Sequence, residues 1–242
     1  MENLRVDIVP GTDFKIIQDK KKFSYGIDAI LLSSFTRPKG LVMDLGTGTG
    51  IIPMRLAARD GFEKIYGVEI QEEVYRLAQR NVELNNLQDR VQIINMNLNE
   101  LHNVFGKSSF DVIVSNPPYM KSGGAIINPD ENFAISRHEI ACKFEDIARI
   151  SNYLLKPLGK FYLVHRPDRL VDILYTMRIY NIEPKYIRFI QPKANKKPNL
   201  ILIEGLKNGK PDLKFHQPLI VYNEDGSYTE EIYKIYGMDK VK

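Results

Sequence analysis

The feature that most constrains the fold is a glycine-rich loop, Asp44-Leu-Gly-Thr-Gly-Thr-Gly50, which directly follows a short apolar segment. The segment Leu41–Leu45 has the composition of a buried strand, and a helix is expected to begin after the loop. In a parallel sheet, such a loop lies at the carboxyl end of its strand, where nucleotide-like ligands bind. The loop therefore predicts a Rossmann-like α/β fold with a ligand site at one edge of the sheet.

The rest of the chain agrees, because short apolar segments alternate with amphipathic ones, as in a parallel sheet covered by helices. Helices are predicted at Glu72–Asn85, at Phe144–Leu155, terminated by Gly159, and at Leu170–Met177. A turn-rich loop joins the last two strands, so we expect these two to pair in antiparallel fashion. The predicted strands are Leu41–Leu45, Lys64–Ile70, Val91–Ile94, Phe110–Ser115, Lys160–His165, Ile187–Ile190 and Leu200–Ile203.

Two flanks surround this unit, and we expect one domain with decorations. Residues 1–39 are predicted to form a hairpin, Phe14–Gln18 with Phe23–Tyr25, followed by a helix at Ile27–Phe35. Residues 40–206 form the predicted ligand-binding domain. The extension 207–242 contains a strand, a turn at Asn223–Gly226 and a last helix near Tyr228–Tyr236, and it is expected to pack on the same domain.

The composition excludes several other protein classes. With 242 residues, of which 43% are hydrophobic, the chain can build a full core, which excludes a disordered or fibrous protein. Its single cysteine, Cys142, excludes an intramolecular disulfide and a zinc site built from cysteines. The N-terminus lacks the pattern of a signal peptide, and no apolar run reaches the roughly 18 residues of a membrane helix. We therefore expect a cytoplasmic protein without membrane contact.

The spacing of the glycines indicates which ligand the loop accepts. A dinucleotide fingerprint would need glycine at position 51, which is isoleucine. Asp44 offers a carboxylate to a cation, and Glu69, at the end of the next strand, can accept hydrogen bonds from two ribose hydroxyls. S-adenosylmethionine fits this set, since it carries an ammonium and a sulfonium but no pyrophosphate. The alternative is an ordinary turn with Glu69 as a surface acid. The predicted cofactor-binding residues of the loop are Gly46, Thr47, Gly48 and Gly50.

A second motif, Asn116-Pro117-Pro118-Tyr119, follows the fourth predicted strand. The two prolines end the strand and hold the backbone extended. If the Asn116 side-chain carbonyl and the Pro117 backbone carbonyl accept the two N–H groups of a planar amino group, its lone pair can attack a sulfonium methyl group. Tyr119 would offer a face on which a flipped base stacks. The four residues are the predicted catalytic group, and no metal is required.

Together, the DLGTGTG loop, Glu69 and the NPPY tetrapeptide resemble the class I S-adenosylmethionine-dependent methyltransferases of the small-domain type. Four further segments, YGIDA from Tyr25, SRHE from Ser136, PNL from Pro198 and the ending IVYNEDGSYTEEIYKIYG, are similar to the tRNA1(Val) adenine N6-methyltransferase group. The resemblance covers nearly the whole chain.

This resemblance implies a seven-stranded, mostly parallel sheet with one antiparallel strand and helices on both faces. It also implies tRNA as the partner, with the adenosine 3′ to the anticodon of a valine tRNA as the target. The family's usual aspartate after the third strand is replaced by Asn97, which can accept the same hydrogen bond without charge assistance. The cofactor site implied outside the glycine loop comprises Tyr25, Gly26, Asp28, Asp44, Glu69, Ile70, Asn97 and Asn116.

Basic residues mark a candidate surface for the RNA. Between Pro184 and His216 the chain carries eight Lys or Arg residues and two acids, whereas its total net charge is +4. The loop Gln191–Pro198 is therefore a candidate phosphate-binding surface, unless it is merely a solvated lysine face. The candidate substrate-binding residues are Arg137, His138, Lys193, Lys196 and Lys197.

Other functions remain open on the residues alone. The NPPY chemistry also suits glutamine N5-methylation of a protein, although a helical N-terminal domain is expected there and only about forty residues precede the glycine loop. N-methylation of another RNA base and a non-catalytic RNA-binding scaffold are further alternatives. A scaffold has no need of Asp44, Glu69 and Asn116 together. We expect a monomer or a weak homodimer.

Overall fold

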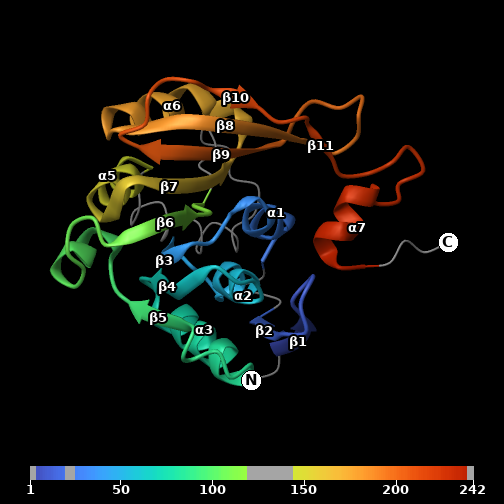
Figure 1. The fold of residues 1–242 in the computed structure, drawn as a ribbon. Helices are drawn as coiled ribbons and strands as arrows, with labels where there is room; N and C mark the ends of the chain where they lie inside the picture. Colours follow the sequence, from blue (N-terminus) through green and yellow to red (C-terminus); the bar gives the residue numbers. More distant parts are fainter. Residues whose placement is uncertain (1–3, 20–24, 119–143, 239–242) are drawn as a thin grey trace, which may run out of the picture.

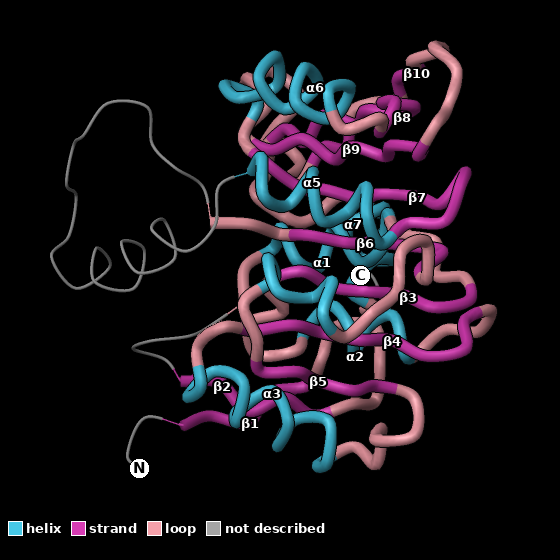
Figure 2. Tube along the Cα trace, turned by 90° about the vertical axis from the view of Figure 1, so that its left-hand side faces the viewer, coloured by secondary structure: helices cyan, strands magenta, loops and turns pink. Residues whose placement is uncertain are grey.

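The computed structural model describes residues 4–19, 25–118 and 144–238. Its centre is a mixed sheet with the strand order β10-β8-β9-β7-β6-β3-β4-β5, and β11 also pairs with β8. Figure 2 shows the strands stacked in this order, with β5 at the lower end. The strands are β3 (Gly40–Leu45), β4 (Phe62–Glu69), β5 (Val91–Asn95), β6 (Phe110–Ser115), β7 (Leu155–His165), β8 (Ile182–Gln191), β9 (Leu200–Lys207), β10 (Lys214–Phe215) and β11 (Leu219–Ile220).

The Rossmann-like prediction is confirmed, with one difference in strand number. The seven predicted strands form the sheet's main body, and β9 is the single strand that runs antiparallel to its neighbours β7 and β8. The two additional strands, β10 and β11, are two residues long and lie parallel along the outer edge of β8. They cover part of the backbone groups that an edge strand would otherwise leave unpaired. Within the described residues, the sheet therefore has nine strands instead of seven.

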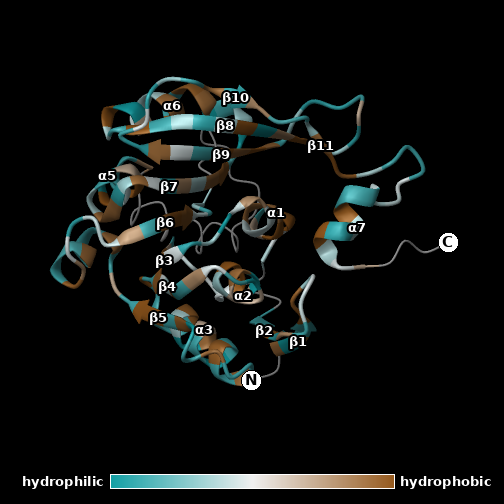
Figure 3. Ribbon diagram, viewed as in Figure 1, coloured by the Kyte–Doolittle hydropathy of each residue, from teal (hydrophilic) through white to brown (hydrophobic). Residues whose placement is uncertain are grey.

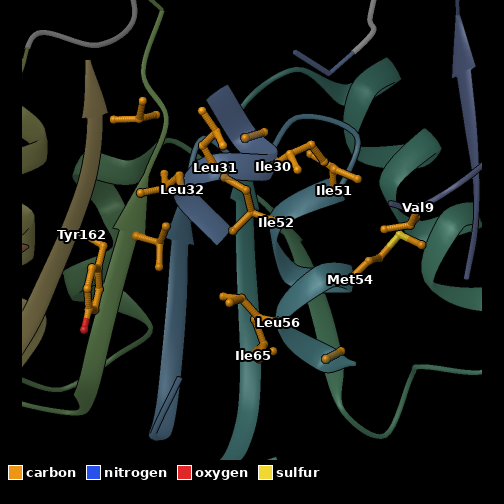
Figure 4. Close-up of a cluster of buried hydrophobic side chains, with 14 of the residues drawn as sticks. Val9, Ile30, Leu31, Leu32, Ile51, Ile52, Met54, Leu56, Ile65 and Tyr162 are labelled. Atoms are coloured by element: carbon orange, nitrogen blue, oxygen red, sulfur yellow. The ribbon is translucent and has the colours of Figure 1, made fainter. Parts of the chain in front are cut away.

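Helices cover both faces of the sheet, as predicted (Figure 1). One hydrophobic cluster joins the sheet to α1, α2 and α3, and the other joins it to α5, α6 and the short helix η1. Figure 4 shows part of the first cluster, in which Ile30 and Leu31 of α1 lie near Ile51 and Ile52 of α2. The helices are α1 (Ile27–Phe35), α2 (Ile51–Ala57), α3 (Glu72–Leu84), η1 (Leu98–Asn103), α5 (Phe144–Leu154), η2 (Pro167–Arg169), α6 (Leu170–Ile179) and α7 (Glu230–Tyr236).

Burial on both faces explains why the central strands are so apolar. Parallel strands covered by helices on both sides have no solvent face, so they read as continuous hydrophobic segments. In Figure 3, apolar stretches run through α1, β6 and β9, whereas the loops at the rim are mostly hydrophilic. Within the described part of the chain, no helix is both long and apolar enough to cross a membrane.

The N-terminal hairpin differs from the prediction. Strand β2 (Lys15–Asp19) pairs with β1 (Leu4–Ile8), so the predicted pairing with Phe23–Tyr25 is wrong at Tyr25, which precedes α1 outside any strand. On its other side, β2 meets two asparagines of α3. Asn81 accepts from the Ile17 N–H at 2.7 Å and donates to the Ile17 carbonyl at 3.1 Å. The side-chain amide of Asn85 likewise accepts from the Lys15 N–H and donates to the Lys15 carbonyl. These amides complete the hydrogen bonding of β2 as a neighbouring strand would.

The end of α5 also differs from the prediction. The helix ends at Leu154, one residue before the predicted Leu155, and Gly159 does not terminate it, because β7 begins at Leu155 instead of the predicted Lys160. The Lys207 ammonium donates to the Asn152 carbonyl and, at 2.6 Å, to the Leu155 carbonyl. A cation at a helix C-terminus satisfies carbonyls that lack helical partners. Lys207, about fifty residues later in the sequence, therefore satisfies backbone carbonyls at the C-terminal end of α5.

The C-terminal extension packs on the N-terminal part of the chain through apolar side chains such as Ile232 and through one buried arginine. The guanidinium of Arg55, in α2, donates to the Pro10 carbonyl of the hairpin loop, to the Ser34 hydroxyl of α1 and to the Ile235 carbonyl of α7. Burial, together with the nearby Arg59, lowers the pKa of Arg55 to about 10. Arg55 thus joins both flanks to the helix that follows the glycine loop.

Candidate active site at the carboxyl edge of the sheet

Three predicted polar side chains meet at one edge of the sheet because their strands are neighbours and parallel. At the carboxyl end of β3, Leu45 pairs with Val68 on one side and Ser115 on the other. The hydrophobic cluster that packs against α1 and α2 contains a residue two positions before Asp44 and another two positions before Asn116. It also contains a residue four positions before Glu69. Side chains alternate between the two faces of a sheet. Asp44 and Glu69 therefore belong to the face covered by α1 and α2, and Asn116 follows the end of β6 at the same edge.

The glycine loop is held by β4 and has no side chains on its open side. The N–H groups of Gly46 and Thr47 both donate to the Val68 carbonyl, at 3.0 and 2.9 Å. Gly46 and Gly48 have φ values of +77° and +56°, which favour glycine. A Cβ built on either residue would meet no atom within 4 Å. The loop therefore presents bare backbone beside open space, as a close-fitting ligand requires.

Asp44 is the most unusual group in this region. Its side chain is fully buried, and neither carboxylate oxygen has a hydrogen-bond partner of good geometry among the described residues. Burial raises the pKa of Asp44 to about 7; the Thr47 hydroxyl lowers it in part, and the Glu69 carboxylate raises it further. A buried carboxylate without donors is costly unless a ligand compensates it. Asp44 is therefore prepared to receive a cationic or hydrogen-bond-donating ligand.

Glu69 is already oriented by the backbone. Its Oε2 accepts from the Gly48 N–H at 3.1 Å, and its Oε1 accepts from the Gln71 N–H at 2.9 Å. A carboxylate has about four acceptor sites, so both oxygens can still accept from a ligand. Next to it, Ile70 is 42% exposed, and its carbonyl accepts from the Asn95 amide at 3.2 Å. The end of β4 thus combines a fixed acceptor pair with an apolar side chain.

The Asn-Pro-Pro segment lies beside the glycine loop. Ser115, the last residue of β6, donates from its hydroxyl to the Leu45 carbonyl at 3.0 Å, which ties the ends of β6 and β3 together. Pro117 is buried, whereas Asn116 and Pro118 are half-buried. The catalytic prediction for Tyr119 and the substrate predictions for Arg137 and His138 lie outside the described residues.

The segment before α1 reaches the same side of the sheet, because α1 packs on α2 directly after the glycine loop. The Tyr25 N–H donates to the Gln18 amide oxygen at 3.1 Å, and Gln18 in turn donates to Asp7 at 2.6 Å. Gly26 is the N-cap of α1, and Asp28 lies in the first turn. The hairpin therefore positions Tyr25, a role that sequence reasoning missed.

Asn97 lies beyond β5, at the N-cap of η1. Its side-chain oxygen accepts from the Asn99 N–H at 3.0 Å, so it already caps this short helix. Capping is a role that asparagine and aspartate share. The replacement of the family's aspartate by Asn97 is therefore compatible with the local fold.

The basic loop between β8 and β9 lies at the same edge of the sheet, because β8 runs parallel to β6 and ends there. Lys196 and Lys197 are exposed. Lys193 is instead half-buried and donates to the Glu224 carbonyl at 2.8 Å, so part of its role is structural. Strands β6 and β8 are three strand spacings apart, about 14 Å. The loop is thus within the width of one nucleic-acid helix from Asn116.

The comparisons with known proteins agree with this geometry. Residues 15–136 match the family described as "methyltransferase small domain". The chain belongs to the methyltransferase small domain family. The predictions of a methyltransferase and of its fold are therefore confirmed, and S-adenosylmethionine is the cofactor expected of such an enzyme. The solved structure of a predicted O-methyltransferase from Agrobacterium tumefaciens has the same fold, with a TM-score of 0.71, 21% identity, and coverage of 87% of this chain and 95% of that one.

Curated relatives span nearly the whole methyltransferase chain. A protein of Porphyromonas gingivalis named tRNA1(Val) (adenine(37)-N6)-methyltransferase is 28% identical, covering 95% of this chain and 93% of the relative. A protein of the same name from Tolumonas auensis is 29% identical, with 90% of each chain covered. The resemblance recognised in the sequence motifs is thus found again along the full length of the chain.

Two residues of this methyltransferase edge escaped sequence reasoning. Arg166 follows β7 directly, next to the Asn-Pro-Pro segment, in extended backbone (φ −79°, ψ 145°) and exposed. Gly67 lies in β4, and a Cβ there would be 2.8 Å from the Thr47 hydroxyl oxygen, so only glycine leaves room for the loop. For Arg166, the sequence signal that could have found it is a cation just beyond a predicted strand. For Gly67, it is a glycine inside an apolar strand. Among the described residues, no group of three acidic, His or Cys side chains could hold a metal ion.

Proposed function

We propose that this enzyme transfers the methyl group of S-adenosylmethionine to the exocyclic N6 of an adenosine in tRNA, at the position 3′ to the anticodon of a valine tRNA. The observation that carries the proposal is the placement of Asp44, Glu69 and Asn116 at one carboxyl edge of the sheet, at the ends of three neighbouring parallel strands. The names of the full-length relatives supply the substrate class and the nucleotide position. We further propose that the enzyme acts in the cytoplasm, with its tRNA.

The residues present fit the cofactor. Bare backbone at Gly46 and Gly48 leaves space for a ligand without a phosphate group. The buried carboxylate of Asp44, which lacks donors of good geometry, suits an ammonium group. Glu69 keeps acceptor sites for two ribose hydroxyls, and the exposed Ile70 offers an apolar surface for a base. When bound, S-adenosylmethionine supplies an electrophilic methyl group on its sulfonium.

The protein's part of the reaction is positioning. The lone pair of the adenine amino nitrogen is delocalised into the ring, so the nitrogen is a weak nucleophile. The Asn116 side-chain carbonyl and the Pro117 backbone carbonyl accept its two N–H groups and direct the lone pair away from the ring plane. The prolines fix these acceptors, because they restrict the backbone on both sides of the reacting position. The methylated nitrogen then loses one proton to solvent.

The RNA follows the carboxyl edge of the sheet. Arg166 lies next to the Asn-Pro-Pro segment and is placed to contact a phosphate beside the target nucleotide. Lys196 and Lys197 follow β8, which is about 14 Å from β6 along the sheet, and we expect them to contact the stem. These side chains contact the backbone and therefore contribute affinity more than sequence recognition.

The test is to incubate the protein with methyl-labelled S-adenosylmethionine and tRNA transcribed without modifications. A valine tRNA is compared with the same tRNA carrying guanosine in place of the adenosine 3′ to the anticodon. We expect label in N6-methyladenosine of the first tRNA and none in the second. Label in a protein fraction offered in parallel would identify glutamine methylation instead, and label in neither would refute methylation of these substrates. Arg166→Ala should retain cofactor binding while its kcat/KM for tRNA falls roughly tenfold.

A further inference from the structure

One buried amide connects the glycine loop to the N-terminal hairpin. Asn81, on α3, is fully buried. Its Nδ2 donates to the Thr49 carbonyl of the glycine loop at 2.9 Å and to the Ile17 carbonyl of β2 at 3.1 Å, while its Oδ1 accepts from the Ile17 N–H at 2.7 Å. An amide nitrogen carries two N–H groups, so both donors of this side chain are used. Asn81 therefore holds two segments that lie 32 and 64 residues away from it in the sequence.

The contact with Thr49 holds the half of the loop that leads into α2. Strand β4 holds the other half, up to the N–H of Gly48. The first backbone bond of α2 goes to the Gly50 carbonyl, so the Thr49 carbonyl lies outside the helix and accepts from Asn81 instead. The glycines on both sides of Thr49 leave this part of the backbone free to adopt other conformations. The amide therefore fixes the loop where its own sequence does not.

The contact with Ile17 holds the strand that positions Tyr25. The next residue of β2, Gln18, is 5% exposed, and its side-chain oxygen accepts from the Tyr25 N–H at 3.1 Å. Tyr25 precedes α1, and it belongs to the segment that the sequence motifs assign to the cofactor site. Through a single strand residue, Asn81 thus reaches the second segment that we expect to contact the cofactor.

We propose that Asn81 is a positioning residue of the cofactor site. The inference rests on the proposed function, since it takes the glycine loop and the Tyr25 segment to be two contacts of S-adenosylmethionine. The amide ties both segments to α3, so their spacing is set before the cofactor binds. A site that is ordered in advance loses less free energy to ordering when its ligand arrives. Removal of the amide should therefore weaken the binding of the cofactor while the catalytic step itself is unaffected.

Asn85, one helical turn later, provides a comparison within the same chain. Its side chain makes the same two bonds to the backbone of Lys15, and its third bond is to the Asn81 carbonyl within α3. Among the described residues, it makes no hydrogen bond to the glycine loop. The two asparagines thus share the task of holding β2, and contact with the loop distinguishes Asn81.

The matched variants are Asn81→Ala and Asn85→Ala. The dissociation constant of S-adenosylhomocysteine, the demethylated cofactor, is measured by calorimetry at a temperature at which circular dichroism shows both variants folded. It should rise at least about tenfold in Asn81→Ala, because a buried bond to the loop is lost, and stay within about twofold in Asn85→Ala. With valine tRNA, Asn81→Ala should raise the KM for S-adenosylmethionine, while kcat and the KM for tRNA stay nearly unchanged. A merely destabilised enzyme would instead lose kcat at constant KM.

Hydrogen exchange in the unaltered protein tests the same link without a variant that could unfold. Saturating S-adenosylhomocysteine should slow exchange of the Ile17 N–H at least about tenfold, because opening of its bond to Asn81 also releases the loop that holds the ligand. The Lys15 N–H, which is bonded to Asn85, should slow much less.

Three results would overturn the proposal: normal affinity in Asn81→Ala, equal losses of affinity in the two variants, or equal slowing of the two amides. Each of them leaves the proposed function intact, because the unaltered protein still binds S-adenosylhomocysteine. Failure of the unaltered protein to bind this compound would overturn the proposed function together with the role of Asn81.

Discussion

Replacement of Asp44 by asparagine tests the electrostatics of the site in the protein without its cofactor. Burial, which outweighs the opposing effect of Thr47, raises the pKa of Asp44 from 3.8 to about 7. The difference of about three pH units corresponds to about 4 kcal/mol, at roughly 1.4 kcal/mol per unit. Ionised Asp44 thus lowers the free energy of unfolding by about this amount at pH 8. Asparagine has nearly the same shape and carries no charge to desolvate.

The sign of the effect follows from where the protons are. Between pH 4 and 7, the folded protein keeps a proton on Asp44 that the unfolded chain has lost, so stability falls as the pH rises through this window and then levels off. The free-energy advantage of Asp44→Asn over the unaltered protein should therefore grow by about 2.6 kcal/mol between pH 5 and pH 8. Urea unfolding followed by circular dichroism at four pH values measures it.

Asp111 provides the control for this experiment. Although burial works in the other direction, Lys156 and the Leu41 N–H hold the pKa of Asp111 below its usual value. Its stabilising contribution is complete above the usual pKa and is lost only as the pH falls below about 4. Asp111→Asn should be destabilising by an amount that is constant from pH 5 to 8. The same flat profile for Asp44→Asn would refute the argument that Asp44 is costly to ionise.

The cofactor provides the second half of the prediction. An ammonium group beside Asp44 favours the ionised carboxylate, so binding must remove the proton below pH 7. The dissociation constant of S-adenosylhomocysteine should therefore rise by up to about tenfold for each pH unit below 7, as measured by calorimetry. Asp44→Asn should be more stable at pH 8 and yet fail to bind. Tight, pH-independent binding by this variant would exclude Asp44 from the cofactor site.

Four further predictions concern the same edge. Asn116→Ala should lower kcat by about 100-fold with cofactor affinity nearly unchanged, in steady-state assays and titrations. Asn97→Asp should tighten cofactor binding, because aspartate keeps the cap and adds charge. Gly48→Ala should cost about 1–2 kcal/mol in thermal unfolding but weaken cofactor binding far more, since its methyl group enters the open space. Lys196→Ala and Lys197→Ala should each reduce the slope of log affinity against log salt by about 1 in tRNA binding.

Each of these predictions has an outcome that contradicts it. Normal turnover of Asn116→Ala would remove this residue from the mechanism, and unchanged cofactor affinity in Asn97→Asp would show that the side chain serves only as a cap. Normal cofactor binding by Gly48→Ala would place the ligand elsewhere. A salt response that neither lysine variant alters would move the RNA away from the loop between β8 and β9.

The parts of the fold that could be predicted are those set by local patterns. Strand β6 and helix α1 begin and end at the predicted residues, because β6 is an apolar segment followed by two prolines and α1 is an isolated, mostly apolar segment that begins after Gly26. The hairpin could not be predicted in this way. Val6 and its neighbours on β1 alternate like a buried strand, yet Val6 is 58% exposed. The other side of β2 is bonded by Asn81 and Asn85, more than sixty residues later in the chain.

The site likewise combines features that local sequence predicts with features that depend on residues distant in the chain. The placement of Asp44, Glu69 and Asn116 at one edge was predictable, because each lies at or directly beside the end of a strand and parallel strands bring their carboxyl ends to one edge. Their orientation was not, since it depends on non-local partners such as the Val68 carbonyl under the glycine loop. Gln18 also has no local motif, although it holds Tyr25 through a backbone hydrogen bond.

The hydrogen bonds of Arg55 join segments of the chain that are synthesised at very different times. Its partner Ile235 is 180 residues further along the chain. At about 5–20 residues per second, a ribosome needs about 9–36 s to cover that distance. During this time the guanidinium of Arg55 lacks one of its acceptors. Helix α7 therefore completes the hydrogen bonding of Arg55. A chain that ended before α7 would leave this buried cation without the Ile235 carbonyl as an acceptor.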